Sequence, residues 1–242
     1  MNRIATYLTD PRATTLRTVV TGSQVRSDGT TELETEDTVF HPEGGGQPAD
    51  TGEITVVGQA YAVVGVRQEW DGRIWHALGT RETATAGAEV HMLIDWSRRH
   101  RLMRTHTAAH LICAIAGEQF GATVTGCEMS ELQGRIDFDG LPGGTADALT
   151  ASLAESVASD GAVRLSWLSA ADAASDPDLV RTRTNRVPSH VDRVRVVSIG
   201  TIDRQADGGT HVASTSEIGR ITVTKVENKG KGNRRVRFEI DD

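Results

Sequence analysis

Two short stretches decide the fold and the candidate site of this chain. They are Arg104-Thr105-His106-Thr107-Ala108-Ala109-His110 and Asp207-Gly208-Gly209-Thr210-His211. The first has a helical pattern, in which residues four apart share one face, so His106 and His110 can bind one ion. The second is a glycine-rich loop that can bring Asp207 and His211 to the same ion. Together the four groups predict a zinc-type site.

The helix that carries the histidine pair is defined by its apolar spacing. Steps of three and four separate Leu102, Thr105, Ala109, Ile112 and Ala116. This period predicts a helix over residues 97–120 with a core-facing stripe. We expect Ser97 to be its N-cap and Gly121 to end it.

Before this helix, short strand patterns alternate with turns such as Asp71-Gly72. Strands are predicted at residues 14–25, 39–40, 53–57, 61–67, 73–77 and 90–94. We therefore expect residues 1–94 to form a small β-barrel domain. Its outstanding feature is the segment His41-Pro42-Glu43-Gly44-Gly45-Gly46-Gln47-Pro48. Three consecutive glycines let a backbone pass very close to a partner, although a wide β-turn would also use them.

Residues 95–242 are predicted to form an α+β domain with an antiparallel sheet and the metal-binding helix. Further strands are expected at residues 123–130, 135–138, 163–168, 193–199, 221–228 and 234–240, with a helix at 145–159 and an irregular, partly helical excursion at 169–187. The last two strands are joined by a hairpin loop with basic side chains at its tip.

Composition limits the class of protein. The 242 residues are 38% hydrophobic and 24% charged, which is typical of a globular protein. No apolar run has the length of a membrane span, and the first residues do not resemble a secretory signal. We expect a cytoplasmic protein with no membrane partner and no obligate protein partner, in which Cys113 and Cys127 are reduced thiols.

Charge is distributed unevenly. The net charge of −7 argues against a protein that coats nucleic acid by bulk electrostatics. However, all three lysines and three arginines gather between Lys225 and Arg237, and a second cluster of four arginines leads into the histidine helix. Either cluster alone could be an ordinary solvated face. Two clusters that bracket a candidate site favour a polyanionic substrate.

Two classes of zinc enzyme are disfavoured by the residues near the pair. The residue after His106 is Thr107, whereas the helix of zinc proteases needs a glutamate there as general base. The chain also lacks the H-x-E and P-C-x-x-C pattern of zinc deaminases that act on nucleic acids. The site therefore predicts a different metal-assisted reaction.

Several motifs resemble, in the same order, the editing region of alanyl-tRNA synthetases. They are the glycine-rich segment 41–48, Asp95-Trp96-Ser97-Arg98-Arg99, residues 103–111, Gly208-Gly209-Thr210-His211-Val212 and Ser216-Glu217-Ile218-Gly219. The closing residues 228–235 resemble freestanding editing proteins of the AlaX type, in the longer form that keeps the glycine-rich barrel. The resemblance covers residues 14–240. It implies a trans-editing hydrolase that removes serine, and as a second candidate glycine, from the tRNA for alanine.

The resemblance also implies roles for individual residues. The metal, Zn²⁺, would be held by His106, His110, Asp207 and His211. The family usually has cysteine at the position of Asp207, so the site here is harder and another divalent ion is open to it. The substrate set would comprise Gly45, Gly46, Gln47, Thr105, Cys127, Gly208, Gly209 and Thr210.

The implied partner is the tRNA acceptor stem with its aminoacylated 3′ end. Its phosphates would be bound by Arg98, Arg99, Arg101, Lys229, Lys231, Arg234 and Arg235. Two alternatives stay open. One is a metal-dependent hydrolase or transferase that acts on a small aminoacyl compound. The other is a non-catalytic tRNA-binding relative that lost its metal through the exchange of cysteine for aspartate.

Overall fold

The computed structural model describes residues 4–180 and 191–242, which cluster into two compact units. The first unit takes in the described part of Met1–Gly44 together with Pro48–His100, and the second takes in Gly45–Gln47 together with Arg101–Asp242. The predicted boundary lay at residue 94. The observed division instead runs through the helix that follows it, and three residues of the glycine-rich motif cluster with the second unit.

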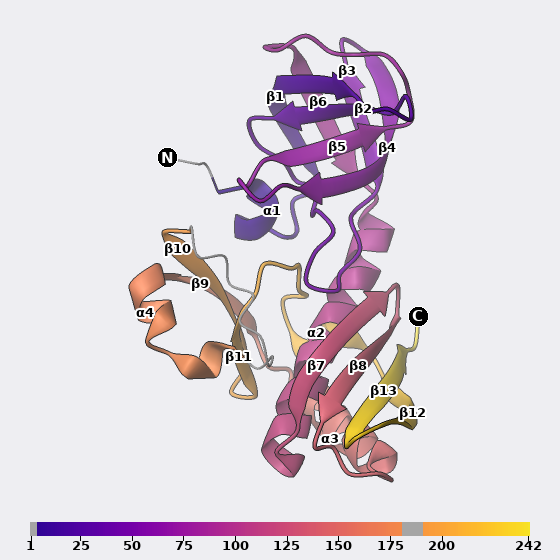
Figure 1. The fold of residues 1–242 in the computed structure, drawn as a ribbon, viewed down its shortest axis with the longest axis vertical. Coiled ribbons are helices and arrows are strands. Elements are labelled where there is room, and N and C mark those ends of the chain that lie inside the picture. The colour runs from indigo at the N-terminus through magenta and orange to yellow at the C-terminus, as the bar shows by residue number, and fades with distance from the viewer. Residues whose placement is uncertain (1–3, 181–190) are drawn as a thin grey trace. The chain divides into compact units, whose positions relative to one another are not determined.

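The first unit is a closed antiparallel barrel, as predicted (Figure 1). Its strands are β1 (Thr15–Val25), β2 (Thr31–Thr35), β3 (Gly52–Val56), β4 (Gln59–Gln68), β5 (Ile74–Leu78) and β6 (Glu89–Ile94), preceded by the short helix α1 (Thr6–Thr9). They pair in the order β1-β2-β5-β4-β3-β6, and β6 returns to β1. Strand β2 was not predicted. The strand expected at residues 39–40 is absent, since Val39 and Phe40 enter the barrel core from an irregular segment.

Strand periodicity explains why the barrel closes around an apolar interior. In β6, Val90, Met92 and Ile94 are buried while the residues between them are exposed. Such alternation places every second side chain inside the barrel. Leu33 of β2 and Ile54 of β3 complete the same core and are fully buried.

The long helix α2 (Trp96–Phe120) carries the histidine pair. Its N-cap is Asp95 rather than Ser97, because the Asp95 carboxylate accepts the N–H of Arg98 at 3.1 Å. The helix ends at Gly121 as predicted, in a left-handed conformation with φ of 67°. From Leu102 to Ala116 most of its side chains are buried, so α2 is a core helix of the second unit.

The second unit adds two antiparallel sheets to α2, which confirms the predicted α+β class (Figure 1). Their elements, in chain order, are β7 (Thr123–Ser130), β8 (Gln133–Asp139), α3 (Ala146–Ala158), β9 (Val163–Ser169), α4 (Ala170–Ala174), the 3-10 helix η1 (Pro177–Leu179), β10 (Arg193–Ile199), β11 (Asp203–Ala206), the 3-10 helix η2 (Thr215–Ile218), β12 (Ile221–Gly230) and β13 (Asn233–Ile240). The sheet orders are β12-β13-β8-β7 and β11-β10-β9.

Two details of this unit differ from the predicted elements or extend them. Strand β11 was not predicted, and it leads directly into the loop that carries Asp207 and His211. The excursion expected at residues 169–187 contains α4 and η1, and its part from 181 onward lies outside the described residues. In the portion of the chain that the structure describes, no helix is long and apolar enough to cross a membrane.

Candidate metal centre

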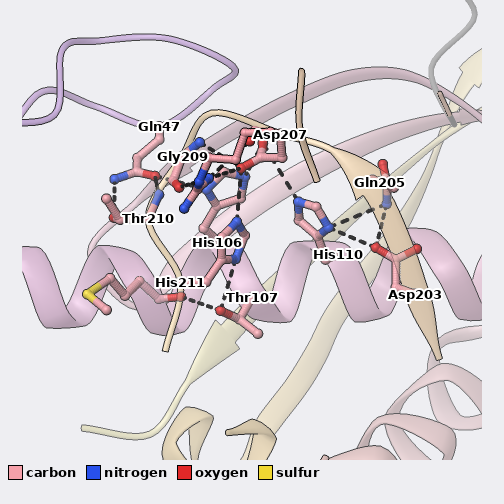
Figure 2. Close-up of polar contacts among 12 residues, drawn as sticks. Gln47, His106, Thr107, His110, Asp203, Gln205, Asp207, Gly209, Thr210 and His211 are labelled. Carbon is pink, nitrogen blue, oxygen red and sulfur yellow. Dashed lines mark hydrogen bonds and ion pairs between the residues drawn. The ribbon is translucent and has the colours of Figure 1, made fainter. Parts of the chain in front are cut away.

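The four predicted ligands meet in the second unit (Figure 2). One nitrogen or oxygen from each of them lies within 4.8 Å of the others. The Nε2 atoms of His106 and His110 lie 3.5 and 3.9 Å from Oδ1 of Asp207, and Nε2 of His211 lies 2.9 Å from its Oδ2. Two ligand atoms of a tetrahedral zinc ion are about 3.3 Å apart. The spacing of the cluster therefore fits one small divalent ion.

His106 is oriented by Gln47 of the glycine-rich motif. Its Nδ1 lies 2.9 Å from the side-chain oxygen of Gln47, which also accepts the N–H of Thr210 at 3.1 Å. The amide nitrogen of Gln47 donates to the Thr210 hydroxyl at 2.9 Å. An amide oxygen can only accept a hydrogen bond, so Nδ1 of His106 carries the proton and Nε2 keeps its lone pair.

His110 is oriented from strand β11. Its Nδ1 lies 2.8 Å from Oδ2 of Asp203, a buried carboxylate that also accepts from the Gln205 amide at 2.7 Å. A carboxylate can only accept, so Nδ1 is the protonated nitrogen. Pairs of this kind, carboxylate to histidine to metal, fix the ring and raise its basicity as a ligand.

His211 is oriented from within α2. Its Nδ1 lies 3.2 Å from the hydroxyl of Thr107, which donates its own proton to the carbonyl of Met103 at 2.8 Å. The same oxygen accepts the N–H of Val212 at 3.3 Å. Since the hydroxyl proton is committed to Met103, Nδ1 of His211 is again the donor. All three imidazoles thus offer Nε2 to the Asp207 carboxylate, and this donor set suits a metal ion.

The titration of the cluster follows from its burial. Loss of solvent lowers the pKa of His106 to about 4 and holds the pKa of His211 well below its usual range. For His110, the carboxylates of Asp203 and Asp207 outweigh burial and raise the pKa to about 9. Burial opposes ionisation of Asp207, but the surrounding imidazoles hold its pKa well below the usual range. Binding of a metal at these nitrogens would release the proton of His110.

Gly209 is required by the closeness of the loop to the helix. A Cβ at this position would lie 2.2 Å from Cε1 of His106 and 2.8 Å from the side-chain oxygen of Gln47. At Gly208, by contrast, a Cβ would meet nothing within 4 Å. Of the two adjacent glycines, only the second is excluded by sterics from carrying a side chain.

Similarity to known proteins identifies the family of the chain. Residues 194–237 match the family described as "Threonyl and Alanyl tRNA synthetase second additional domain". The chain is 36% identical over 220 residues to the alanyl-tRNA editing protein AlaX-M of Saccharolobus solfataricus, covering 90% of this chain and 92% of that protein. It is 35% identical over 215 residues to AlaX-M of Methanosarcina barkeri, covering 85% of this chain and 87% of that protein. The chain belongs to the alanyl-tRNA editing protein family.

The same similarity extends to a full-length ligase. The alanine–tRNA ligase of Sulfurisphaera tokodaii is 33% identical over 216 residues, which cover 87% of this chain but 24% of the ligase. This editing-family chain therefore corresponds to one portion of that larger enzyme.

Gly46 of the glycine-rich motif packs against β7. The N–H of Met129 donates to the carbonyl of Gly46 at 3.1 Å, and a Cβ on Gly46 would lie 2.8 Å from the carbonyl oxygen of Cys127. Gly45 and Gly46 both have positive φ, 62° and 94°, which favours glycine. Their assignment to substrate binding, with that of Cys127, stays a prediction, and Gln47 has the additional task of orienting His106.

Thr105, predicted to contact the substrate, makes its hydrogen bonds within the protein. It is fully buried, its hydroxyl donates to the carbonyl of Arg101 at 2.9 Å, and it accepts the N–H of Leu132 at 2.9 Å. The hydroxyl is thus committed to holding the turn between β7 and β8 against α2. The helix threonine that contacts the cluster is Thr107.

Arg99, predicted to bind phosphate, is enclosed by the protein. Its side chain is fully buried in the first unit, where Nε lies 2.9 and 3.0 Å from the two oxygens of Asp50. Its terminal nitrogens donate to the carbonyls of Pro11 and Val39 at 2.8 and 2.6 Å. A guanidinium enclosed in this way has no surface to offer a phosphate. The neighbouring Arg98 and Arg101 are partly exposed, and Arg101 is paired with Asp242 at 2.8 Å.

The C-terminal basic cluster is partly neutralised by its own sheet. Arg235 pairs with Asp137 of β8 at 2.7 Å, because the two residues face each other in the β13–β8 ladder. Lys229 and Lys231 lie exposed around the hairpin turn, and Arg234 is half-buried. Of the predicted phosphate-binding residues in this cluster, the two lysines are the most accessible.

Sequence reasoning missed Asp203 and Thr107 as partners of the ligands. Asp203 lies in β11, whose four residues are too short and polar to give a strand signal. Thr107 was noted only as the residue that replaces a protease glutamate. A buried hydroxyl beside a histidine ligand was the available signal, since such histidines generally bond a second partner.

Proposed function

We propose that this protein is a trans-editing aminoacyl-tRNA deacylase, which hydrolyses the ester between a wrong amino acid and the tRNA for alanine. Serine is the expected amino acid and glycine the second candidate. The observation that carries the proposal is the convergence of three Nε2 atoms on Asp207. It is supported by similarity to editing proteins over most of the chain. Because the substrate is a charged tRNA, we place the protein in the cytoplasm.

The chemistry requires a divalent ion held by His106, His110, Asp207 and His211. When bound, such an ion activates water and polarises an ester carbonyl. Zinc suits three imidazoles and one carboxylate, and the oxygen of Asp207 also admits harder ions. Gln47, Asp203 and Thr107 keep the ligands in one orientation, so little reorganisation accompanies binding.

In the reaction, a water oxygen bonds to the ester carbonyl carbon, and the bond from that carbon to the ribose oxygen breaks. One water proton passes to the ribose oxygen, so the products are a free amino acid and uncharged tRNA. A second hydrolytic site of this kind is needed because a binding pocket for alanine cannot reject serine strongly enough. A Cβ on Gly45 would meet nothing within 4 Å, so this glycine would allow close approach of the 3′ end.

Recognition of tRNA would rest on the exposed basic residues. Lys229 and Lys231 at the β12–β13 turn, with Arg98, Arg101 and Arg234, would bind phosphates of the acceptor stem. Contacts of this type position a nucleic acid without reading its sequence. They also outweigh the overall charge of −7 locally, because the cluster is concentrated on one hairpin.

The test is a deacylation assay on seryl-, glycyl- and alanyl-tRNA for alanine, with and without a chelator. We expect rapid release of serine, slower release of glycine, little release of alanine, and loss of activity on metal removal. Small seryl esters serve as the control substrate. Equal rates on tRNA and small esters would contradict the tRNA substrate, and full activity without bound metal would contradict the metal-assisted reaction.

A further inference from the structure

The two oxygens of Asp207 lie in different surroundings. Oδ2 accepts the N–H of Gly209 at 2.6 Å, lies 2.9 Å from Nε2 of His211 and is 3.8 Å from the NH1 nitrogen of Arg195. Oδ1 is contacted only by Nε2 of His106 and His110 among the described residues. Both oxygens therefore face ligand nitrogens, but only Oδ2 also accepts a backbone N–H and lies near a guanidinium.

Arg195 explains how this asymmetry is maintained. It lies on β10, its side chain is almost entirely buried, and its NH1 donates to the carbonyls of Asp207 and Gly209 at 3.0 and 2.8 Å. The guanidinium thus joins both ends of the turn that carries Asp207. A buried cation beside Oδ2 also attracts that oxygen electrostatically.

From these contacts we infer that Arg195 is a positioning residue that makes Asp207 offer a metal ion one oxygen, Oδ1. Binding through both oxygens would require Oδ2 to leave the Gly209 N–H and to move away from the guanidinium. A carboxylate that binds through one oxygen contributes one ligand atom, as a cysteine sulfur does. The site would then offer a metal ion three nitrogens and one oxygen. This role rests on the proposed metal site.

The consequence concerns coordination number. Four protein atoms complete a tetrahedral site, so a water or substrate atom would have to enter as a fifth ligand, an expansion that catalytic zinc centres make during reaction. A carboxylate free to bind through both oxygens would fill that fifth position. Arg195 would therefore keep a position open for substrate without touching it.

The test uses the full chain loaded with Co²⁺, whose visible absorption is intense at four-coordination and weak at higher coordination. We compare the unchanged protein with Arg195→Gln and Arg195→Lys. Arg193→Gln is the matched control, because Arg193 lies on the same strand with its guanidinium 5.7 Å from the Trp167 ring. We expect Arg195→Gln to weaken the absorption and to lower Co²⁺ affinity about 10- to 100-fold. Arg195→Lys should retain part of both, and the control should change neither.

The same Arg195 substitutions in an Asp207→Cys variant distinguish positioning of the Asp207 carboxylate from a general effect on the loop. In Asp207→Cys, the single sulfur cannot bind through two atoms, so adding Arg195→Gln should leave the Co²⁺ spectrum unchanged. An equal spectral change in both backgrounds would overturn the inference, as would an unchanged spectrum and affinity in folded Arg195→Gln. If Arg195→Gln does not fold, the Arg195→Lys comparison in the two backgrounds gives the same decision. Absence of Co²⁺ binding by the unchanged protein would overturn this role and the metal site, whereas binding without deacylation would overturn the proposed function alone.

Discussion

Both units bury histidine, but they satisfy it differently. In the barrel, His76 uses both nitrogens on the protein: Nδ1 donates to the carbonyl of Leu33 at 3.0 Å, and Nε2 accepts from the hydroxyl of Thr38 at 2.7 Å. In the second unit, three histidines bond Nδ1 to a neighbouring side chain and direct Nε2 toward one shared carboxylate, that of Asp207. A buried histidine with both nitrogens bonded is a structural residue. Several buried histidines whose Nε2 atoms converge on one carboxylate form a site for a cation.

Buried charges show the same contrast. Asp50 and Arg99 neutralise each other inside the barrel, and the remaining donors of the guanidinium reach backbone carbonyls. Asp207 instead leaves one oxygen facing two imidazole nitrogens. An enclosed pair is complete without a ligand, whereas the Asp207 cluster has donors arranged for one.

Removal of the His106 side chain is expected to have the largest effect. We expect His106→Ala to lower kcat/KM on seryl-tRNA by about 1,000-fold, because loss of a ligand removes several kcal/mol of transition-state stabilisation. Deacylation rates and metal content per chain measure this effect. His91→Ala, an exposed histidine on β6, is the control and should behave as the unchanged protein. Full activity with stoichiometric metal in His106→Ala would refute the assignment.

The barrel side of the comparison is tested by pH. Burial lowers the pKa of His76 from 6.5 to about 4. Unfolded chains therefore take up a proton on this residue between pH 6.5 and 4 while folded chains do not, so acidification favours unfolding. Above pH 6.5, His76 is neutral in both states and does not affect stability. As the pH falls from 6.5 to 4, the free energy of unfolding decreases by about 3 kcal/mol on account of this residue.

Denaturant unfolding across this pH range, in the unchanged protein and in His76→Gln, measures the difference in slope. We expect the variant to lose the part of the pH dependence that belongs to His76. Parallel curves for the two proteins would show that His76 is not held neutral in the barrel.

A smaller effect is expected from a substitution at Gly209, which tests how closely the loop packs against the helix. Gly209→Ala should weaken metal binding about 10- to 100-fold, because its Cβ would displace His106 or the Gln47 side chain. Gly208→Ala is the matched control, since nothing lies within 4 Å of its added carbon. Metal titration of both variants decides the matter, and equal affinities would contradict the close packing of loop and helix.

The smallest expected effect concerns the exposed charges. Lys229→Ala and Lys231→Ala should each reduce the salt dependence of tRNA binding by about one unit of slope. Lys225→Ala is the control, because Lys225 is paired with Glu227 at 2.9 Å in the same hairpin. Binding measured at several salt concentrations gives the slopes. A larger loss in the control than in either lysine variant would place the phosphate contacts elsewhere.

Local sequence patterns were enough to predict the helix α2, most of the barrel strands and the four candidate ligands. The period of 3.6 located α2 and put His106 and His110 on one face, and alternation with turn residues located five of the six barrel strands. The two x₃-spaced pairs, together with the glycine-rich motif, led to the correct family and to the four residues that converge. These features are encoded over a few neighbouring positions, where spacing alone fixes which side chains share a face.

Tertiary structure decided the rest, because contacts between distant residues leave no local pattern. Arg98 and Arg99 are adjacent in sequence, yet only Arg99 is enclosed with Asp50. Thr105 and Thr107 are two residues apart, and packing against different neighbours gives one a structural bond and the other a bond to His211. The free nitrogens also depend on partners up to 104 residues away in sequence. The candidate ligands could be predicted from the sequence, whereas packing determined which of their atoms face the site where a metal ion would bind.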